Sequence, residues 1–187
     1  MLITILGPDG TGKTTLANKL AQDYNNLEYI YFGSNIESRK YKYFSSFLYS
    51  QKSGKWNTFL KYIFIFINDF YYFNLSKKKH LISDRCPIDK YVGSMVYMDK
   101  HRNLYHKFTL KLFPNPDLII LLEGDPEIIY SRKKEIPSDA ILKYIRLYKK
   151  YIQSNRIKSL IIDTTKYGIE ETYDLANVKI NALLNER

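Results

Sequence analysis

The segment with the clearest chemical signature is GPDGTGKT, residues 7–14. Its spacing matches G-x-x-x-x-G-K-[ST], a loop whose backbone N–H groups surround the phosphates of a nucleotide. Gly10 and Gly12 let those N–H groups turn inward, because glycine adopts backbone conformations that other residues avoid. Lys13 would then reach the β- and γ-phosphates, and the Thr14 hydroxyl would bind Mg²⁺ between them. The pattern predicts phosphoryl transfer from a nucleoside triphosphate such as ATP, with Mg²⁺.

The nucleotide is expected to contact this phosphate loop and the first turn of the helix after it. The expected contacts are Gly7, Asp9, Gly10, Thr11, Gly12, Lys13, Thr14 and Thr15. Lys13 is expected to be exposed in the loop. Two interpretations of Asp9 stay open: a turn residue that binds local N–H groups, or a catalytic carboxylate beside the transferred phosphoryl group.

A loop of this kind must be held between a buried strand and a helix. The apolar run at 2–6 predicts the strand, and residues 13–24 predict a helix with one apolar face. Further strands are expected at 27–32, 80–84, 117–123 and 159–163, and helices at 88–112, 125–135, 138–153 and 168–184. Alternating strands and helices predict an α/β fold of three layers, with a five-stranded parallel sheet and helices on both faces.

Polar residues follow four of these strands at the point where each strand ends. Besides the phosphate loop they are Asp84–Arg85, the segment 123–125 and Asp163–Thr164. Ligands of open α/β sheets bind beyond the carboxyl ends of the strands. We therefore expect these residues to form one site.

The same segments carry a resemblance to a known family. GPDGTGKTT at 7–15, LISDR at 81–85, PDLIILLEGDPEIIYSRKKE at 116–135 and LIIDTTKYGIEETYDLANVKI at 160–180 are similar to the thymidylate kinase-like family of P-loop nucleoside-monophosphate kinases. The resemblance covers most of the chain. It implies the P-loop NTPase fold and an ATP- and Mg²⁺-dependent kinase.

The resemblance also implies roles for residues outside the phosphate loop. Asp84 would hold Mg²⁺ through water, and Thr164 would lie near the adenine. Arg85 and Arg132, the latter in a short lid at about 131–138, would bring catalytic positive charge to the transferred phosphoryl group. The alternatives are an ion pair of Arg85 with Asp84 or Asp89, and an exposed helix face for Arg132.

The acceptor half of the sequence departs from the family. YFGSNIESRKY at 31–41 and DRCPIDKYVGSMVYMD at 84–99 do not match its usual segments. The acceptor is expected to bind at about 36–75, where one aromatic residue would stack on a base and Arg39 would hold a phosphate; the alternative is that most of these aromatic residues belong to the core. The aromatic candidates are Tyr41, Tyr43, Phe44, Phe47, Trp56, Phe66, Phe70 and Tyr71.

The leading functional hypothesis is a thymidylate-like nucleoside-monophosphate kinase built as a single domain over residues 1–187. One alternative is a related enzyme that phosphorylates a sugar or nucleoside hydroxyl, for example in a surface-polysaccharide pathway. A second is a P-loop ATPase that binds nucleic acid through the net charge of +10, which the scattered basic residues disfavour. A small-molecule acceptor is the expected partner, with a homodimer left open and no membrane association.

The compartment is expected to be the cytoplasm. The chain has one cysteine, Cys86, which fits a reducing environment. Its first residues lack the basic and apolar regions of a signal peptide.

Overall fold

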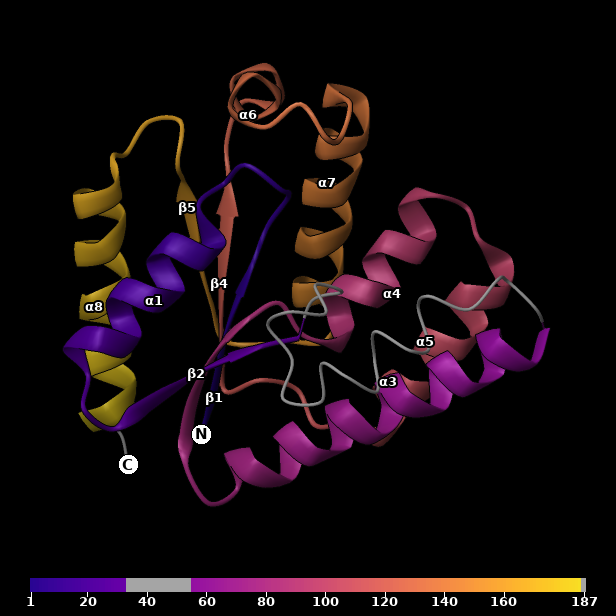
Figure 1. The fold of residues 1–187 in the computed structure, drawn as a ribbon. Coiled ribbons are helices and arrows are strands. Elements are labelled where there is room, and N and C mark those ends of the chain that lie inside the picture. The colour runs from indigo at the N-terminus through magenta and orange to yellow at the C-terminus, as the bar shows by residue number, and fades with distance from the viewer. Residues whose placement is uncertain (33–54, 186–187) are drawn as a thin grey trace.

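The structure is a computed structural model that describes residues 1–32 and 55–185. Five strands form one parallel sheet in the order β2-β3-β1-β4-β5 (Figure 1). Their bounds are β1 (Leu2–Leu6), β2 (Leu27–Tyr31), β3 (His80–Asp84), β4 (Leu118–Glu123) and β5 (Ser159–Asp163). All five lie within one residue of the ranges expected from the sequence, because strands covered on both faces are almost continuously apolar.

Helices cover both faces of this sheet. Their bounds are α1 (Lys13–Asp23), α3 (Lys55–Ser76), α4 (Pro87–Val96), α5 (Lys100–Leu112), α6 (Pro126–Arg132), α7 (Ser138–Ser154) and α8 (Ile169–Asn185). In Figure 1, α1 and α8 lie on one side of the sheet, and α3, α4, α5 and α7 lie on the other. The expected three-layer α/β fold is confirmed.

Strand β4 shows how the two faces are built. Leu118, Ile120 and Leu122 belong to the core shared with α1 and α8, whereas Ile119 and Leu121 pack with residues of α4 and α7. This alternation follows from the two-residue period of a strand. Both faces of β4 are therefore buried in the core, and a ligand-binding site can form only at the ends of this strand.

Two helix starts near the site have clear local causes. Asp125 caps α6 by accepting hydrogen bonds from the N–H groups of Glu127 and Ile128, and Pro126 occupies the first helical position, where its missing N–H costs nothing. The helical stretch expected at 88–112 is divided by a turn at Met98, with Asp99 capping α5.

Several expectations lie outside the described residues. Residues 33–54 contain Arg39, Tyr41, Tyr43, Phe44 and Phe47, and the side chain of Trp56 is also not described. The acceptor region at 36–75, the lid and the single-domain organisation stay predictions. Within the described ranges, no helix combines the length and the apolar character needed to span a membrane.

Candidate active site

The phosphate loop follows β1 directly and begins with a tight approach to β4. Gly7 has a φ of 149°, and a Cβ atom at this position would lie 2.3 Å from the carbonyl oxygen of Leu122. The Thr11 hydroxyl donates to the carbonyl of Pro8 at 2.8 Å. Gly7 and Thr11 therefore shape the loop, which α1 continues from Lys13.

Lys13 is buried in the loop, so the expectation that it is exposed was wrong. Its ammonium group donates to the carbonyl of Pro8 at 2.8 Å and to the Asp9 carboxylate at 3.3 Å. Burial lowers the pKa of Lys13, while the charge of Asp9 opposes that shift. The loop curls around its own lysine, and incoming phosphate oxygens would have to replace these two acceptors.

Thr14 and Asp84 meet where α1 begins and β3 ends. The Thr14 hydroxyl donates to Oδ2 of Asp84, and Oδ1 of Asp84 is buried with no hydrogen-bond partner among residues 1–32 and 55–185. Burial raises the pKa of Asp84. A buried carboxylate oxygen without a donor, beside a hydroxyl, suits Mg²⁺, which binds proteins through one or two carboxylates and takes its other ligands from phosphates and water.

Within the described part of the chain, no larger acidic cluster is available for that ion. Among the described residues, no group of three or more His, Cys, Asp or Glu side chains is arranged to hold a metal. Thr14 and Asp84 would thus hold Mg²⁺ together with a bound nucleotide.

Arg85 stands directly after β3 in an unusual backbone conformation. Its φ of 71° lies in the left-handed region, and its N–H donates to the carbonyl of Ile5 at 3.0 Å. A non-glycine residue held there is a form of strain that concentrates at functional sites. The backbone of Arg85 is thus tied to the carboxyl end of β1.

The guanidinium of Arg85 lies between two carboxylates. It pairs with Asp9 and, at 3.2 Å, with Asp89, which also accepts a hydrogen bond from Tyr148 of α7. Burial lowers the pKa of Arg85, but Asp89 and Asp9 raise it well above its usual value. The ion pair with Asp89 considered from the sequence is present, and the guanidinium makes a second ion pair, with Asp9.

Asp9 connects the two candidate cations of the site. Burial raises the pKa of Asp9, but the charges of Lys13 and Arg85 outweigh this and lower it. The carboxylate is therefore ionised, and it contacts Lys13 on one side and Arg85 on the other. This position goes beyond that of a residue that only shapes a turn.

Arg132 and Thr164 meet on the other side of the phosphate loop. The guanidinium of Arg132, the last residue of α6, donates to the carbonyl of Thr164 at 2.8 Å and to its hydroxyl at 3.4 Å. The N–H of Thr164 in turn donates to the carbonyl of Glu123 at 2.8 Å. The segment after β5 and the end of α6 are thereby joined over the end of β4.

Most of the expected residues line one cavity of about 460 Å³. Those that line it are Asp9, Gly10, Gly12, Lys13, Thr14, Thr15, Asp84, Arg85 and Arg132. Gly7, Thr11 and Thr164 are not in this lining. The cavity is thus built from the ends of β1 and β3, the start of α1 and the end of α6.

Three further residues line the cavity and were missed from the sequence: Tyr29, Tyr31 and Lys133. Tyr31 lies beside Asp84 in the pairing of β2 with β3. Burial raises the pKa of Tyr29 to about 12, so its hydroxyl remains a donor. Knowing that β2 pairs with β3 would have identified both tyrosines, but the sequence gives no strand order.

Three of the proposed stacking residues, Phe66, Phe70 and Tyr71 of α3, do not line this cavity. Phe66 packs 5.5 Å from the ring of Phe113 and 6.2 Å from that of Phe70, and Tyr71 meets Tyr72 edge to face. Of the proposed stacking residues, these three belong to an aromatic cluster between α3 and its neighbours.

Cys86 begins α4, next to Arg85. Its side chain is 1% exposed, and burial raises the pKa of the thiol to about 12. The thiol is therefore a small apolar group under the site.

Solved structures with the same fold include a thymidylate kinase, a deoxyadenosine kinase and the YorR protein. A thymidylate kinase from Candida albicans has a TM-score of 0.70 at 17% identity, over 97% of this chain and 92% of its own. A deoxyadenosine kinase from M. mycoides with the products dCMP and dCDP has a TM-score of 0.65 at 19% identity, over 97% and 100%. The YorR protein of Bacillus subtilis, in complex with phosphorylated GDP, has a TM-score of 0.61 at 20% identity, over 100% and 99%.

These structural similarities establish a shared fold, and a comparison of the sequence with family models identifies the family. No curated protein matches the chain in sequence. The family model for thymidylate kinase matches residues 5–174, which includes the phosphate loop, Asp84–Arg85, Arg132 and Thr164. The chain therefore belongs to the thymidylate kinase family and is a P-loop kinase.

Proposed function

We propose that this kinase transfers the γ-phosphate of ATP, bound with Mg²⁺, to the phosphate of a nucleoside monophosphate such as dTMP. The observation that carries the proposal is the row of alternating charges Lys13, Asp9 and Arg85 at the floor of the cavity. Phosphoryl transfer needs positive charge on the transferred group and alignment of donor and acceptor. Two cations on either side of one carboxylate supply both.

Each residue has a distinct part in the proposed reaction. Lys13 leaves the carbonyl of Pro8 for the β- and γ-phosphates, and the N–H groups of the phosphate loop bind the oxygens that remain. Arg85 binds the transferred group through two oxygens at once, as the planar guanidinium allows. Mg²⁺, held by Thr14 and Asp84, would neutralise charge that develops on the phosphates.

Asp9, Arg132 and Thr164 complete the proposed site. The Asp9 carboxylate lies between Lys13 and Arg85 and fixes their separation. An acceptor bound in the cavity could contact this carboxylate. Arg132 already contacts the Thr164 segment, so it is suited to cover the nucleotide from the side of α6. Thr164 supports that segment near the expected adenine position.

The acceptor is best identified by a screen of ADP formation. Purified protein, ATP and Mg²⁺ are combined with panels of nucleoside monophosphates, nucleosides and sugars. We expect ADP release that depends on a nucleoside monophosphate, and a diphosphate product by mass spectrometry. Release that depends only on nucleosides or sugars would replace the proposed acceptor with a hydroxyl, an alternative favoured by the unmatched segments at 31–41 and 84–99.

Lys13→Met provides the matched control for this screen. It removes the ammonium group but keeps the length and apolar character of the stem. We expect turnover to fall by about 10²–10³-fold, the usual cost of one lost donor to transition-state charge, with an unchanged circular dichroism spectrum. Turnover of wild-type rate would contradict the proposed site, and turnover stimulated by DNA without an acceptor would favour an ATPase that binds nucleic acid.

We further propose that the enzyme is a homodimer that pairs through α3 and α5. These helices adjoin, because the Tyr105 hydroxyl donates to the carbonyl of Tyr62 at 2.7 Å. Apolar side chains that are 39–71% exposed recur along both: Leu60, Ile63, Ile67 and Phe70 on α3, and Leu104, Phe108 and Leu112 on α5. A standard interface takes about 800 Å² of surface from each partner, and these exposed apolar side chains would form the centre of such a contact.

The proposed occupant of this face is a second copy of the same chain. A two-fold axis would set the apolar face of α3 and α5, defined by those seven side chains, against itself, as an isologous interface requires.

The proposed compartment is the cytoplasm, where ATP is available and a lone cysteine stays reduced.

A further inference from the structure

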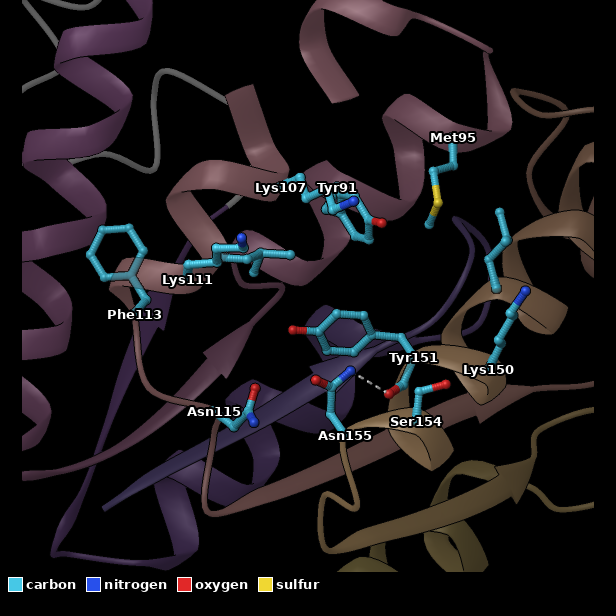
Figure 2. A pocket seen from close by; sticks show the side chains of 12 residues that line it. Tyr91, Met95, Lys107, Lys111, Phe113, Asn115, Lys150, Tyr151, Ser154 and Asn155 are labelled. Carbon is cyan, nitrogen blue, oxygen red and sulfur yellow. Dashed lines mark hydrogen bonds between the residues drawn. The ribbon is translucent and has the colours of Figure 1, made fainter. Parts of the chain in front are cut away.

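A second cavity, also of about 460 Å³, lies between α5 and α7 and is lined in part by α4 (Figure 2). None of its lining residues lines the nucleotide cavity. Asn115 comes shortly before β4, and Ser154 and Asn155 come shortly before β5. This second cavity, which we name the effector cavity, therefore lies toward the amino ends of the strands. The phosphate loop lies at the opposite, carboxyl end of the sheet.

One part of the effector cavity is apolar and aromatic. Tyr91 and Met95 of α4 face Tyr151 of α7 across it (Figure 2), and the two tyrosine rings meet edge to face at 6.1 Å. Burial raises the pKa of Tyr151 to about 12, so its hydroxyl stays protonated. A flat ring would find both aromatic edges and a polarisable sulfur here.

The rest of the lining is cationic. Lys107 and Lys111 come from α5 and Lys150 from α7, and the lining contains no carboxylate. Across the described ranges, no acidic side chain lies within ion-pair distance of these three ammonium groups. The dipole of α5 accounts for Lys111, which lies in its last turn, but not for three lysines from two helices around one hollow.

We propose that this cavity binds a small organic anion, with an aromatic ring among Tyr91, Met95 and Tyr151 and a phosphate or carboxylate attracted by the positive charge of Lys107, Lys111 and Lys150. The volume is within the range of small-molecule sites, and an apolar wall with a few polar groups is their usual composition. Lysine side chains reach an anion flexibly while their stems cover apolar surface.

Two helices that line the effector cavity, α4 and α7, are also connected to Arg85 of the phosphate site. On α7, Leu147 and Tyr151 line the cavity, while the neighbouring Tyr148 donates to Asp89. On α4, Tyr91 lines the cavity, and Asp89 pairs with Arg85. A ligand that changes the spacing of α4 and α7 therefore acts on the contacts of Arg85, and its binding is coupled to catalysis to the extent that it prefers one spacing.

Binding is tested by calorimetry with three probes on the full chain: 2-naphthyl phosphate, 2-naphthoate and the neutral 2-naphthol. We expect at least one anion to bind at least tenfold more tightly than 2-naphthol. The tighter of the two anions tells whether the site prefers a phosphate or a carboxylate. Heat absent for both anions at millimolar concentration would overturn the proposal.

Two triple variants and one single variant locate the bound probe. Lys107→Gln, Lys111→Gln and Lys150→Gln together should weaken the preferred anion at least tenfold. Lys77→Gln, Lys78→Gln and Lys179→Gln make the same change of charge at exposed sites elsewhere and should leave the affinity unchanged. Lys13→Met should also leave it unchanged, and equal losses in both triple variants, or a loss in Lys13→Met, would show the probe bound elsewhere.

The coupling is tested by turnover with the preferred anion at saturation, and this part rests on the proposed kinase function. We expect kcat or KM to change at least twofold in the wild type and not in the Lys107, Lys111 and Lys150 variant. Unchanged turnover with the anion bound would overturn the coupling. If no acceptor supports turnover at all, the proposed function fails, whereas the calorimetric result on the cavity stands by itself.

Discussion

The side chains of the phosphate site contact one another. Lys13, Asp9 and Arg85 alternate in charge, and Asp84 keeps one buried oxygen without a donor among the described residues. The sequence predicted the types of these residues, because the loop pattern specifies a lysine and a hydroxyl at fixed positions. It could not predict that Lys13 turns back onto Pro8, since that depends on the path of the loop in space.

Replacing Arg85 with lysine should separate its charge from its shape. Lysine keeps the charge but lacks the planar fork that binds two oxygens, so we expect kcat to fall by about 10³-fold or more, as for other arginines that stabilise phosphoryl transfer. Arg156→Lys is the control, because Arg156 also has a positive φ, of 50°, but is exposed after α7. Steady-state kinetics of both variants decide, and a wild-type rate for Arg85→Lys would leave Arg85 as a structural ion pair.

Asp84→Asn should stabilise the nucleotide-free protein while it reduces activity. Burial raises the pKa of Asp84 in the folded state, so folding favours the protonated form, and ionisation at pH 7 costs stability. The neutral amide avoids that cost. We expect a higher Tm at pH 7 without Mg²⁺, and a difference that shrinks as the pH falls through the raised pKa, where wild-type Asp84 takes up its proton.

Thermal melts of Asp84→Asn at several pH values, with and without ATP and Mg²⁺, test this expectation. The ligands should stabilise the wild type more than the variant, because the variant lacks the carboxylate for the metal. A lower Tm than wild type at pH 7 without ligands would show that the charges of Lys13 and Arg85 outweigh the burial of Asp84.

At the scale of elements, the phosphate loop is packed against α6 through a glycine. A Cβ atom at Gly10 would lie 2.9 Å from the carbonyl oxygen of Ile129, whereas one at Gly12 would meet nothing within 4 Å. The start of α6 was predictable from Asp125 and Pro126, which are local signals. Its contact with Gly10 was not, because it joins elements that are far apart in the sequence.

Gly10→Ala and Gly12→Ala form a matched pair that isolates this contact. Both positions have a left-handed φ, of 94° and 85°, so both variants carry the same backbone cost of about 1–2 kcal/mol. Only Gly10→Ala also forces α6 away, which should remove a further 1–3 kcal/mol or so of stability. Urea denaturation without nucleotide measures the free energy of unfolding of both variants. Equal losses of stability would mean that α6 moves away from the new Cβ atom at no cost.

At the scale of the whole molecule, the fold followed from the sequence to a large extent. Strands buried on both faces are nearly pure apolar runs, and the alternation with helices fixes a parallel sheet. The strand order could not be predicted from the sequence, so Tyr29 and Tyr31 were not predicted to line the nucleotide cavity. The effector cavity could not be predicted from the sequence for a similar reason. Three helices build it, and each of its residues, taken alone, has the pattern of an ordinary surface or core residue.

The proposed dimer gives a prediction at the same scale. Phe108→Glu places a charge in the middle of the apolar face of α3 and α5, where Phe108 is 62% exposed, so it should leave the fold intact but convert the dimer to a monomer at micromolar concentration. Val178→Glu changes an exposed apolar residue of α8 and should not. Size-exclusion chromatography with light scattering distinguishes the two masses, and a wild-type monomer would contradict the interface.

The buried position of Cys86 makes the chain convenient for spectroscopic labelling. It is the single cysteine of the sequence, and a thiol with a pKa of about 12 that is closed to solvent forms almost no thiolate at neutral pH. A maleimide dye would therefore attach only to a cysteine introduced on the surface, for example at Lys133 on the rim of the nucleotide cavity. Rearrangement of α6 could then be followed by fluorescence in the native sequence background.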